Sequence, residues 1–157
     1  RTGRILNILY LMMQGMLDIP ILYISSYIIK NKSDHYKLLN HNNKTYEWED
    51  WIIFMLTAVE ETALNTIQKI NKITQLLDHG IALVKTKAEK IYRRELVDLV
   101  FEQPYCKIDY VVEQLGVERK AASRYLKELE NIGLLKSEKI GRETLYINVE
   151  LIKILGE

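Results

Sequence analysis

The sequence predicts a mainly α-helical protein, with an all-helical N-terminal part followed by a winged helix-turn-helix domain that carries a small β-hairpin wing. Three observations predict this fold class. Glycine and proline are scarce, with 7 and 2 among 157 residues. Apolar residues recur at helical spacing through most of the first 90 positions. The pattern then changes, because two short helices joined by a glycine are followed by two β-rich runs.

The first half of the chain is expected to contain helices joined by short turns. The tripeptide Asp-Ile-Pro ends the first helix, and Ser33 is a plausible N-cap for the third, which runs to about Leu39. The polar run NHNNKT that follows has the composition of a loop. The expected bounds of these three segments are residues 3–17, 21–30 and 33–39.

From Tyr46 the apolar residues keep a spacing of mostly three and four over far more than 25 positions. A periodic stretch of that length indicates either an interdomain strut or a helical hairpin broken near Gly80. The apolar stripe begins at Trp48 and Trp51 and reaches Leu77. We therefore expect three parts: residues 1–78 as one domain, 79–92 as a linker, and 93–157 as a second domain.

The second domain has the order of elements of a winged helix. A helix stopped by Pro104 precedes two helices joined at Gly116 and Val117, and two short β-rich runs flank the sequence IGRE. Gly116 permits the positive φ of a tight turn, and Gly133 ends the second helix of the pair. The buried stripe of that second helix is predicted to be Ala121, Ala122, Leu126 and Leu129.

Composition excludes several classes of protein. The net charge is +1, and neither half is a basic module, so no global field points to nucleic acid or to a membrane surface. The apolar runs are too short to span a bilayer. The single cysteine, Cys106, excludes an internal disulfide and a cysteine zinc cluster, and is more simply a buried small hydrophobe than a nucleophile. We expect a cytoplasmic protein without membrane contact.

Two arginines, Arg1 and Arg4, lie at the start of the first predicted helix. Cations there oppose the helix dipole by about 0.3–1 kcal/mol each, unless an anion offsets them. Guanidinium groups match phosphate oxygens in bidentate geometry, so a polyphosphate would reverse the sign of the interaction. From these residues alone, a solvated terminus and a phosphate site both stay open.

The ordered series RTGRILNILYL, GMLDIPILYISSYIIKNKSDHYKLL and WEDWIIFMLTAVEETA resembles the Fic family of AMP-transferring enzymes, from the middle of its signature HPFxxGNGRxxR onward. The segments YRRELVDLVFEQPYCKIDYVVEQLGVERKAASRYLKELENIGLL and GRETLYIN are similar to the winged-helix extension of one bacterial-type branch. The resemblance implies that residues 1–78 are the C-terminal part of a Fic core, beginning inside the catalytic motif.

The resemblance also implies an ATP site. It assigns Arg1 and Arg4 to the triphosphate, and Thr2 and Gly3 to the backbone around the phosphates. Family members carry a Tyr-Tyr pair beside the adenine, and the matching positions here are His35 and Tyr36, so His35 departs from the pattern. Some members use an asparagine on the base, which Asn43 matches. The ATP-binding residues implied by the resemblance are therefore Arg1, Thr2, Gly3, Arg4, His35, Tyr36 and Asn43.

The implied activity is transfer of AMP from ATP, with Mg²⁺, to a Ser, Thr or Tyr hydroxyl of a protein. The resemblance places the catalytic histidine and the Mg²⁺-holding acidic residue before residue 1, so this chain is expected to hold no catalytic residue and no metal ligand. A regulatory glutamate is expected there too, because Thr57 and Glu61 are followed by Thr62 where the inhibitory motif requires Gly or Asn. The chain alone is expected to be inactive.

A transcription regulator is the alternative function, with the helical half as scaffold or dimerisation element. The second helix of the pair would then enter the DNA major groove, with wing residues Lys136, Lys139 and Arg142 at phosphates. Several glutamates dilute that face, and the domain charge is near neutral, so a protein partner and a homodimer also stay open. The residues expected to contact DNA are Arg119, Lys120, Ser123, Arg124 and Lys127.

Overall fold

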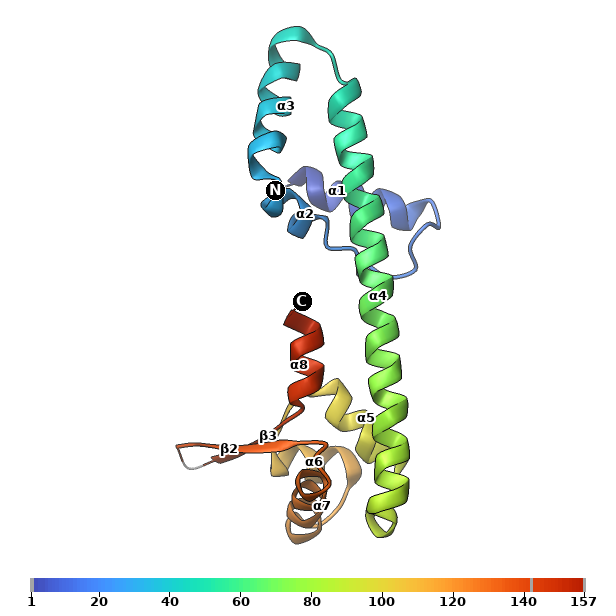
Figure 1. The fold of residues 1–157 in the computed structure, drawn as a ribbon, viewed down its shortest axis with the longest axis vertical. Coiled ribbons are helices and arrows are strands. Elements are labelled where there is room, and N and C mark those ends of the chain that lie inside the picture. Colours follow the sequence, from blue (N-terminus) through green and yellow to red (C-terminus); the bar gives the residue numbers. More distant parts are fainter. Residues whose placement is uncertain (1, 142, 157) are drawn as a thin grey trace. The chain divides into compact units, whose positions relative to one another are not determined.

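A computed structural model describes residues 2–141 and 143–156 of the chain (Figure 1). The chain divides into two compact units, Arg1–Gln68 and Lys69–Glu157, and each has a hydrophobic core of its own. The predicted fold class is confirmed, because the described residues are mainly helical and a small antiparallel sheet lies in the C-terminal unit. No helix among these residues is both long and apolar enough to cross a bilayer.

The N-terminal unit contains four helical segments: α1 (Thr2–Met13), α2 (Ile24–Lys30), α3 (Lys32–Thr45) and the first part of α4 (Glu49–Lys87). Its core is small. Four apolar residues are buried there, and partly buried side chains from α1 and α4 pack around them. The four are Leu22, Ile24, Ile28 and Ala58.

Helix α3 differs from its prediction at both ends. Its N-cap residue is Asn31, so Ser33 lies inside the first turn and is not the cap. The predicted loop at residues 40–45 is wrong, because the helix continues to Thr45 and ends where Tyr46 takes a φ of 60°. The polar composition suggested a loop, but Asn42 is fully buried and its amide faces backbone carbonyls within the fold.

Helix α4 is continuous from Glu49 to Lys87, so the predicted break near Gly80 is wrong and the strut is the correct alternative. Gly80 is needed for close packing. A Cβ built on it would lie 3.3 Å from both Leu134 Cδ1 and Phe101 Cε2. Glycine at this position therefore lets these side chains approach the helix backbone, at a modest cost in helix propensity.

The segment expected to be a linker, residues 79–92, is structured. Its first part continues α4 and its second forms the short 3₁₀ helix η1 (Glu89–Ile91). Val84, Ala88 and Ile91 in this segment are buried in the core of the C-terminal unit. The division into two units falls earlier, between Gln68 and Lys69 within α4.

The C-terminal unit continues with α5 (Arg94–Glu102), β1 (Tyr105–Cys106), α6 (Ile108–Leu115), α7 (Arg119–Asn131), β2 (Lys136–Ile140), β3 (Glu143–Ile147) and α8 (Val149–Gly156). The three strands form an antiparallel sheet in the order β1-β3-β2. Tyr105 pairs with Ile147, and Ser137 pairs with Tyr146. The sequence did not indicate β1 or α8.

The helix-turn-helix of this unit has the predicted glycines at its turns. Gly116 has a φ of 61° and caps α6, while Gly133 has a φ of 83° directly after α7. Ala122, Leu126 and Leu129 are fully buried, as expected for the inner stripe of α7, whereas Ala121, predicted to belong to the same stripe, is only half-buried. The order helix, helix-turn-helix, β-hairpin is therefore confirmed.

Candidate functional site

A groove of about 730 Å³ lies among the helices of the N-terminal unit. Helix α3 contributes His35 and Tyr36, and α4 contributes a run of mainly apolar side chains. Helix α1 supplies Asn7, Tyr10 and Leu11. The groove is mostly apolar and aromatic with few polar groups, which is the usual composition of a site for a small organic ligand.

Aromatic rings meet at this groove from two helices. The His35 ring centroid lies 4.9 Å from that of Trp51, 5.2 Å from that of Tyr36 and 6.0 Å from that of Phe54, all in edge-on geometry. His35 and Tyr36 are consecutive on α3, while Trp51 and Phe54 are one turn apart on α4. Tyr36 keeps 52% of its surface exposed, so a planar ligand can reach the cluster. Such a set of rings can stack on a flat heterocycle.

The predicted base-contacting residues are thus only partly brought together. His35 and Tyr36 line the groove, whereas Asn43 is exposed and does not line it. The neighbouring Asn42 is buried, and the surrounding carbonyls assign the orientation of its amide: with the nitrogen turned toward them, it donates to Leu38, at 3.0 Å, and Glu47, at 2.6 Å. Asn42 therefore closes the connection between α3 and α4 and contacts no ligand space.

The predicted phosphate-binding residues lie at the N-terminus of α1. Arg1 is outside the described residues. Thr2, Gly3 and Arg4 form the first turn of the helix, and their side chains are outside the described set as well. Arg4 precedes Asn7 by three residues, about one helical turn. The backbone of the predicted phosphate segment thus begins one turn before the groove.

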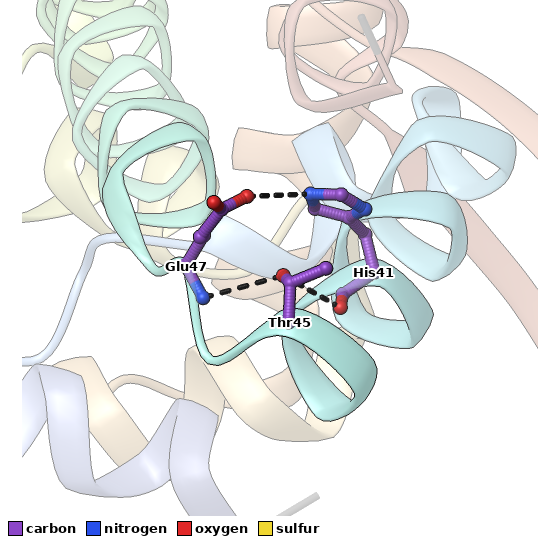
Figure 2. Close-up of polar contacts among 3 residues, drawn as sticks. All are labelled: His41, Thr45 and Glu47. Carbon is purple, nitrogen blue, oxygen red and sulfur yellow. Dashed lines mark hydrogen bonds and ion pairs between the residues drawn. The ribbon is translucent and has the colours of Figure 1, made fainter.

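Figure 2 shows a polar cluster at the end of α3. His41 Nε2 lies 3.2 Å from Glu47 Oε2, and the Thr45 hydroxyl donates to the His41 carbonyl at 3.1 Å. The same hydroxyl accepts from the Glu47 backbone N–H at 3.3 Å. Both ionisable side chains are exposed, and the hydroxyl is engaged with the backbone. The cluster caps the helix end and presents no nucleophile.

Several residues of the groove were missed as site residues by sequence reasoning. Trp51 and Met55 belong to the apolar stripe of α4, which the periodicity predicted only as a packing face. Asn7 and Tyr10 lie in an ordinary apolar helix pattern. One sequence signal could have indicated Asn7: it lies one turn after Arg4 and is the polar residue within an apolar run.

Other candidate reactive groups have structural roles. Cys106 is fully buried, as predicted, and burial raises the pKa of its thiol to about 11. The thiol is therefore protonated at neutral pH and is a poor nucleophile. Within residues 2–141 and 143–156, no three His, Cys, Asp or Glu side chains gather in a way that could hold a metal ion.

The residues expected to contact DNA lie on or beside the outer surface of α7. Lys120, Arg124 and Lys127 are exposed, and Ser123 is half-buried. Arg119 is already paired, because its guanidinium donates to the Asp109 carboxylate on α6. Three of the five predicted residues are therefore accessible to a partner, and Ser123 is partly accessible.

Comparison with protein families gives a match that covers the helix-turn-helix and the hairpin. Residues 76–151 match the family described as protein adenylyltransferase SoFic-like, C-terminal domain. The match includes the end of α4 and continues into α8. It agrees with the independent resemblance of residues 1–78 to the Fic core. Residues 76–151 therefore match a Fic-family C-terminal domain, which supports the assignment of this part of the chain to the Fic family.

Proposed function

We propose that this chain is the C-terminal part of an enzyme that transfers AMP from ATP to a protein hydroxyl, and that its groove holds the adenine. The observation that carries the proposal is the meeting of His35 and Tyr36 with Trp51 at one groove. The family resemblance assigns the first two positions to the adenine site. Their location in an aromatic groove supports that assignment.

The groove suits a purine in size and chemistry. Its volume of about 730 Å³ lies in the range of sites for small organic ligands. Trp51 and Tyr36 offer ring surfaces for stacking, and the Asn7 amide can both donate to and accept from a base edge. His35 replaces a tyrosine of the family pattern but keeps a flat ring that contacts Trp51.

The phosphates would lie toward the first turn of α1. Backbone N–H groups at a helix N-terminus favour anions, and Arg1 and Arg4 would add bidentate contacts. A base in the groove and phosphates at this turn would place the nucleotide along α1. In this arrangement the chain binds and orients ATP.

The transfer itself needs groups that this chain does not supply. The target hydroxyl attacks the α-phosphorus, the bond from that phosphorus to the bridging oxygen breaks, and pyrophosphate leaves while the hydroxyl proton passes to a base. His35 lies in the groove and His41 is beside Glu47 at the helix end, so neither matches the motif histidine. Mg²⁺, which neutralises phosphate charge in such transfers, is assigned no ligand in this chain.

The first test is nucleotide binding by the 157-residue chain. Both tryptophans, Trp48 and Trp51, lie in the N-terminal unit, so ATP in the groove should quench their fluorescence saturably. Tyr36→Ala should weaken binding by about 5–150-fold, because base stacking contributes about 1–3 kcal/mol. Tyr23→Ala is the matched control, since Tyr23 is 62% exposed and does not line the groove. Equal affinities of the two variants would refute the assignment.

The second test is transfer of labelled AMP from ATP to protein. We expect none from this chain alone, because it lacks the motif histidine. A polypeptide extended upstream should contain the sequence HPFxxGN and should be active. Transfer by the 157-residue chain itself would contradict this account of the missing base.

A further inference from the structure

The outer face of α7 carries three exposed cations. Lys120, Arg124, Lys127 and Asn131 follow one another at intervals of four, three and four residues, which places them on one stripe. All four are exposed, and the stripe lies opposite the fully buried Leu126 and its neighbours. No apolar side chain belongs to the stripe.

The acidic residues of α7 are held beside this stripe. Glu130 Oε1 accepts the Ser137 backbone N–H at 2.9 Å, so this carboxylate is fixed to the start of β2. Glu128 is half-buried and lies 3.4 Å from Asn131 Nδ2. In a sequence pattern these glutamates dilute the basic face. In the structure the Glu130 carboxylate accepts from Ser137, and the Glu128 carboxylate accepts from Asn131 at the end of the stripe.

The cations of the stripe differ in their own partners. The Arg124 guanidinium lies 5.6 Å from the centroid of the Tyr125 ring. For Lys120 and Lys127 the described part of the chain shows no ion pair or hydrogen bond, but after the hydrogen bonds from Ser137 the charge of Lys127 also helps to lower the pKa of Glu130. Two exposed ammonium groups and one oriented guanidinium are therefore available to an anionic partner.

A hollow of about 560 Å³ beside α7 extends the cationic surface. Lys87, at the end of α4, and Lys90, in η1, line it together with Arg124. Glu89 and Glu128 also line it, so its net charge is only weakly positive. The hollow borders the stripe because Arg124 belongs to both.

The wing adds exposed lysines. Lys136 begins β2, and Lys139 pairs with Thr144 next to the turn of the hairpin. Lys107, which precedes α6, forms an ion pair with Glu143 on β3 and is not available in the same way. Helix and wing thus both carry exposed cations.

We infer that the outer face of α7 binds duplex DNA, with its cations at the phosphates that flank the major groove. The second helix of a helix-turn-helix lies in that groove, which is about 12 Å wide and admits one α-helix. A protein partner is disfavoured, because protein interfaces have apolar or aromatic centres and this stripe has none. This inference does not depend on AMP transfer.

The experiment is a fluorescence-anisotropy titration of a labelled 24-base-pair duplex of random sequence with the 157-residue chain, between 50 and 200 mM salt. Three phosphates neutralised by the stripe predict a slope of log affinity on log salt of about −2.7, which is an affinity loss of about 40-fold over this range. Replacing Lys120 by Gln should reduce the steepness by about 0.9.

The decisive variant replaces Lys120, Arg124 and Lys127 by Gln together and should abolish the salt-dependent binding. The matched control replaces Lys30, Lys32 and Lys44 by Gln. These are three exposed lysines of the N-terminal unit, so their replacement should leave binding of the duplex unchanged. Circular dichroism checks that both variants are folded, which is expected because all six side chains are exposed.

Three results would overturn the inference. The first is that the chain does not bind the duplex in a salt-sensitive way. The second is that the α7 variant and its control lose affinity for the duplex equally. The third is displacement of the duplex by poly-L-glutamate of equal charge at equal concentration, which would assign the stripe to acidic proteins. A much weaker affinity for a single strand of the same length supports recognition of the duplex.

Discussion

Replacing Asn42 by alanine tests whether the α3–α4 connection is built as described. The Asn42 side chain is fully buried, and in the amide orientation that its surroundings assign it donates to two carbonyls, those of Leu38 and Glu47. A typical hydrogen bond contributes about 0.5–1.5 kcal/mol, and a buried group left without a partner costs about 1–3 kcal/mol. We therefore expect the N-terminal unit to lose about 2 kcal/mol of unfolding free energy.

The adjacent Asn43 is the matched control. It has the same side chain, lies in the same helix and is exposed, so Asn43→Ala should change stability by no more than about 0.5 kcal/mol. The family resemblance assigned Asn43 to the base, whereas in the structure Asn42 is the buried asparagine and Asn43 is exposed. The pair of variants tests which of the two asparagines stabilises the fold.

Urea unfolding followed by tryptophan fluorescence is the suitable assay, because both tryptophans lie in the N-terminal unit. With a slope near 2 kcal/mol/M, Asn42→Ala should lower the urea midpoint by about 1 M. Far-UV circular dichroism should show that the C-terminal unit keeps its transition. An Asn43→Ala variant that is less stable than Asn42→Ala would refute the reasoning.

Three further predictions concern the C-terminal unit. Hydrogen bonds from the Ser137 side chain and backbone lower the pKa of Glu130, so its stabilising contribution is present above the unfolded pKa and lost as pH falls through the folded pKa. The Ser137 amide resonance should titrate below the usual glutamate pKa of about 4.3 and should not titrate in Glu130→Gln. Gly116→Ala should lower the unfolding free energy, measured in a thermal melt, by about 1–2 kcal/mol. A Cβ at this position meets no atom within 4 Å, so the cost comes from the φ of 61° alone. Gly116→Asn should cost less, because asparagine tolerates this backbone conformation better. Cys106 should be alkylated by iodoacetamide at pH 8 at least about 100-fold more slowly than in urea, because its pKa is raised to about 11; equal rates would contradict its burial.

The helix-turn-helix could be predicted from the sequence because local and global signals agree there. Gly116 and Gly133 mark the turns, and Leu126 and Leu129 repeat at helical spacing. The hairpin followed from β-rich runs around a glycine turn. Strand β1 could not be predicted, since its two residues become a strand only by pairing with β3.

Long-range packing explains the error at Gly80, and local hydrogen bonds explain the error in α3. Glycine within a helical pattern usually suggests a break, but Gly80 is retained so that Phe101 can approach the helix. The polar run that ends α3 suggests a loop, but its Asn42 is buried and its Thr45 caps the helix. The Gly80 contacts join residues far apart in sequence, whereas the partners of Asn42 and Thr45 are at most five residues away and are overlooked because polar composition alone suggests a loop.

The candidate site was predictable only in part. His35 and Tyr36 were found through the family resemblance, and their groove is consistent with it. Trp51 could not be distinguished from the other members of the apolar stripe on α4, because a site residue and a packing residue share the same helical spacing. Only the folded arrangement of α3 against α4 brings its ring to His35.

Photolabelling with 8-azido-ATP tests the central claim most directly. Trypsin cleaves after Lys32 and Lys37 and so releases residues 33–37, a peptide that holds both His35 and Tyr36. We predict that mass spectrometry will find the label on this peptide or on the peptide that contains Trp51, and that excess ATP will prevent labelling. Labelling confined to the C-terminal unit, or unaffected by ATP, would contradict the assignment of the groove to adenine.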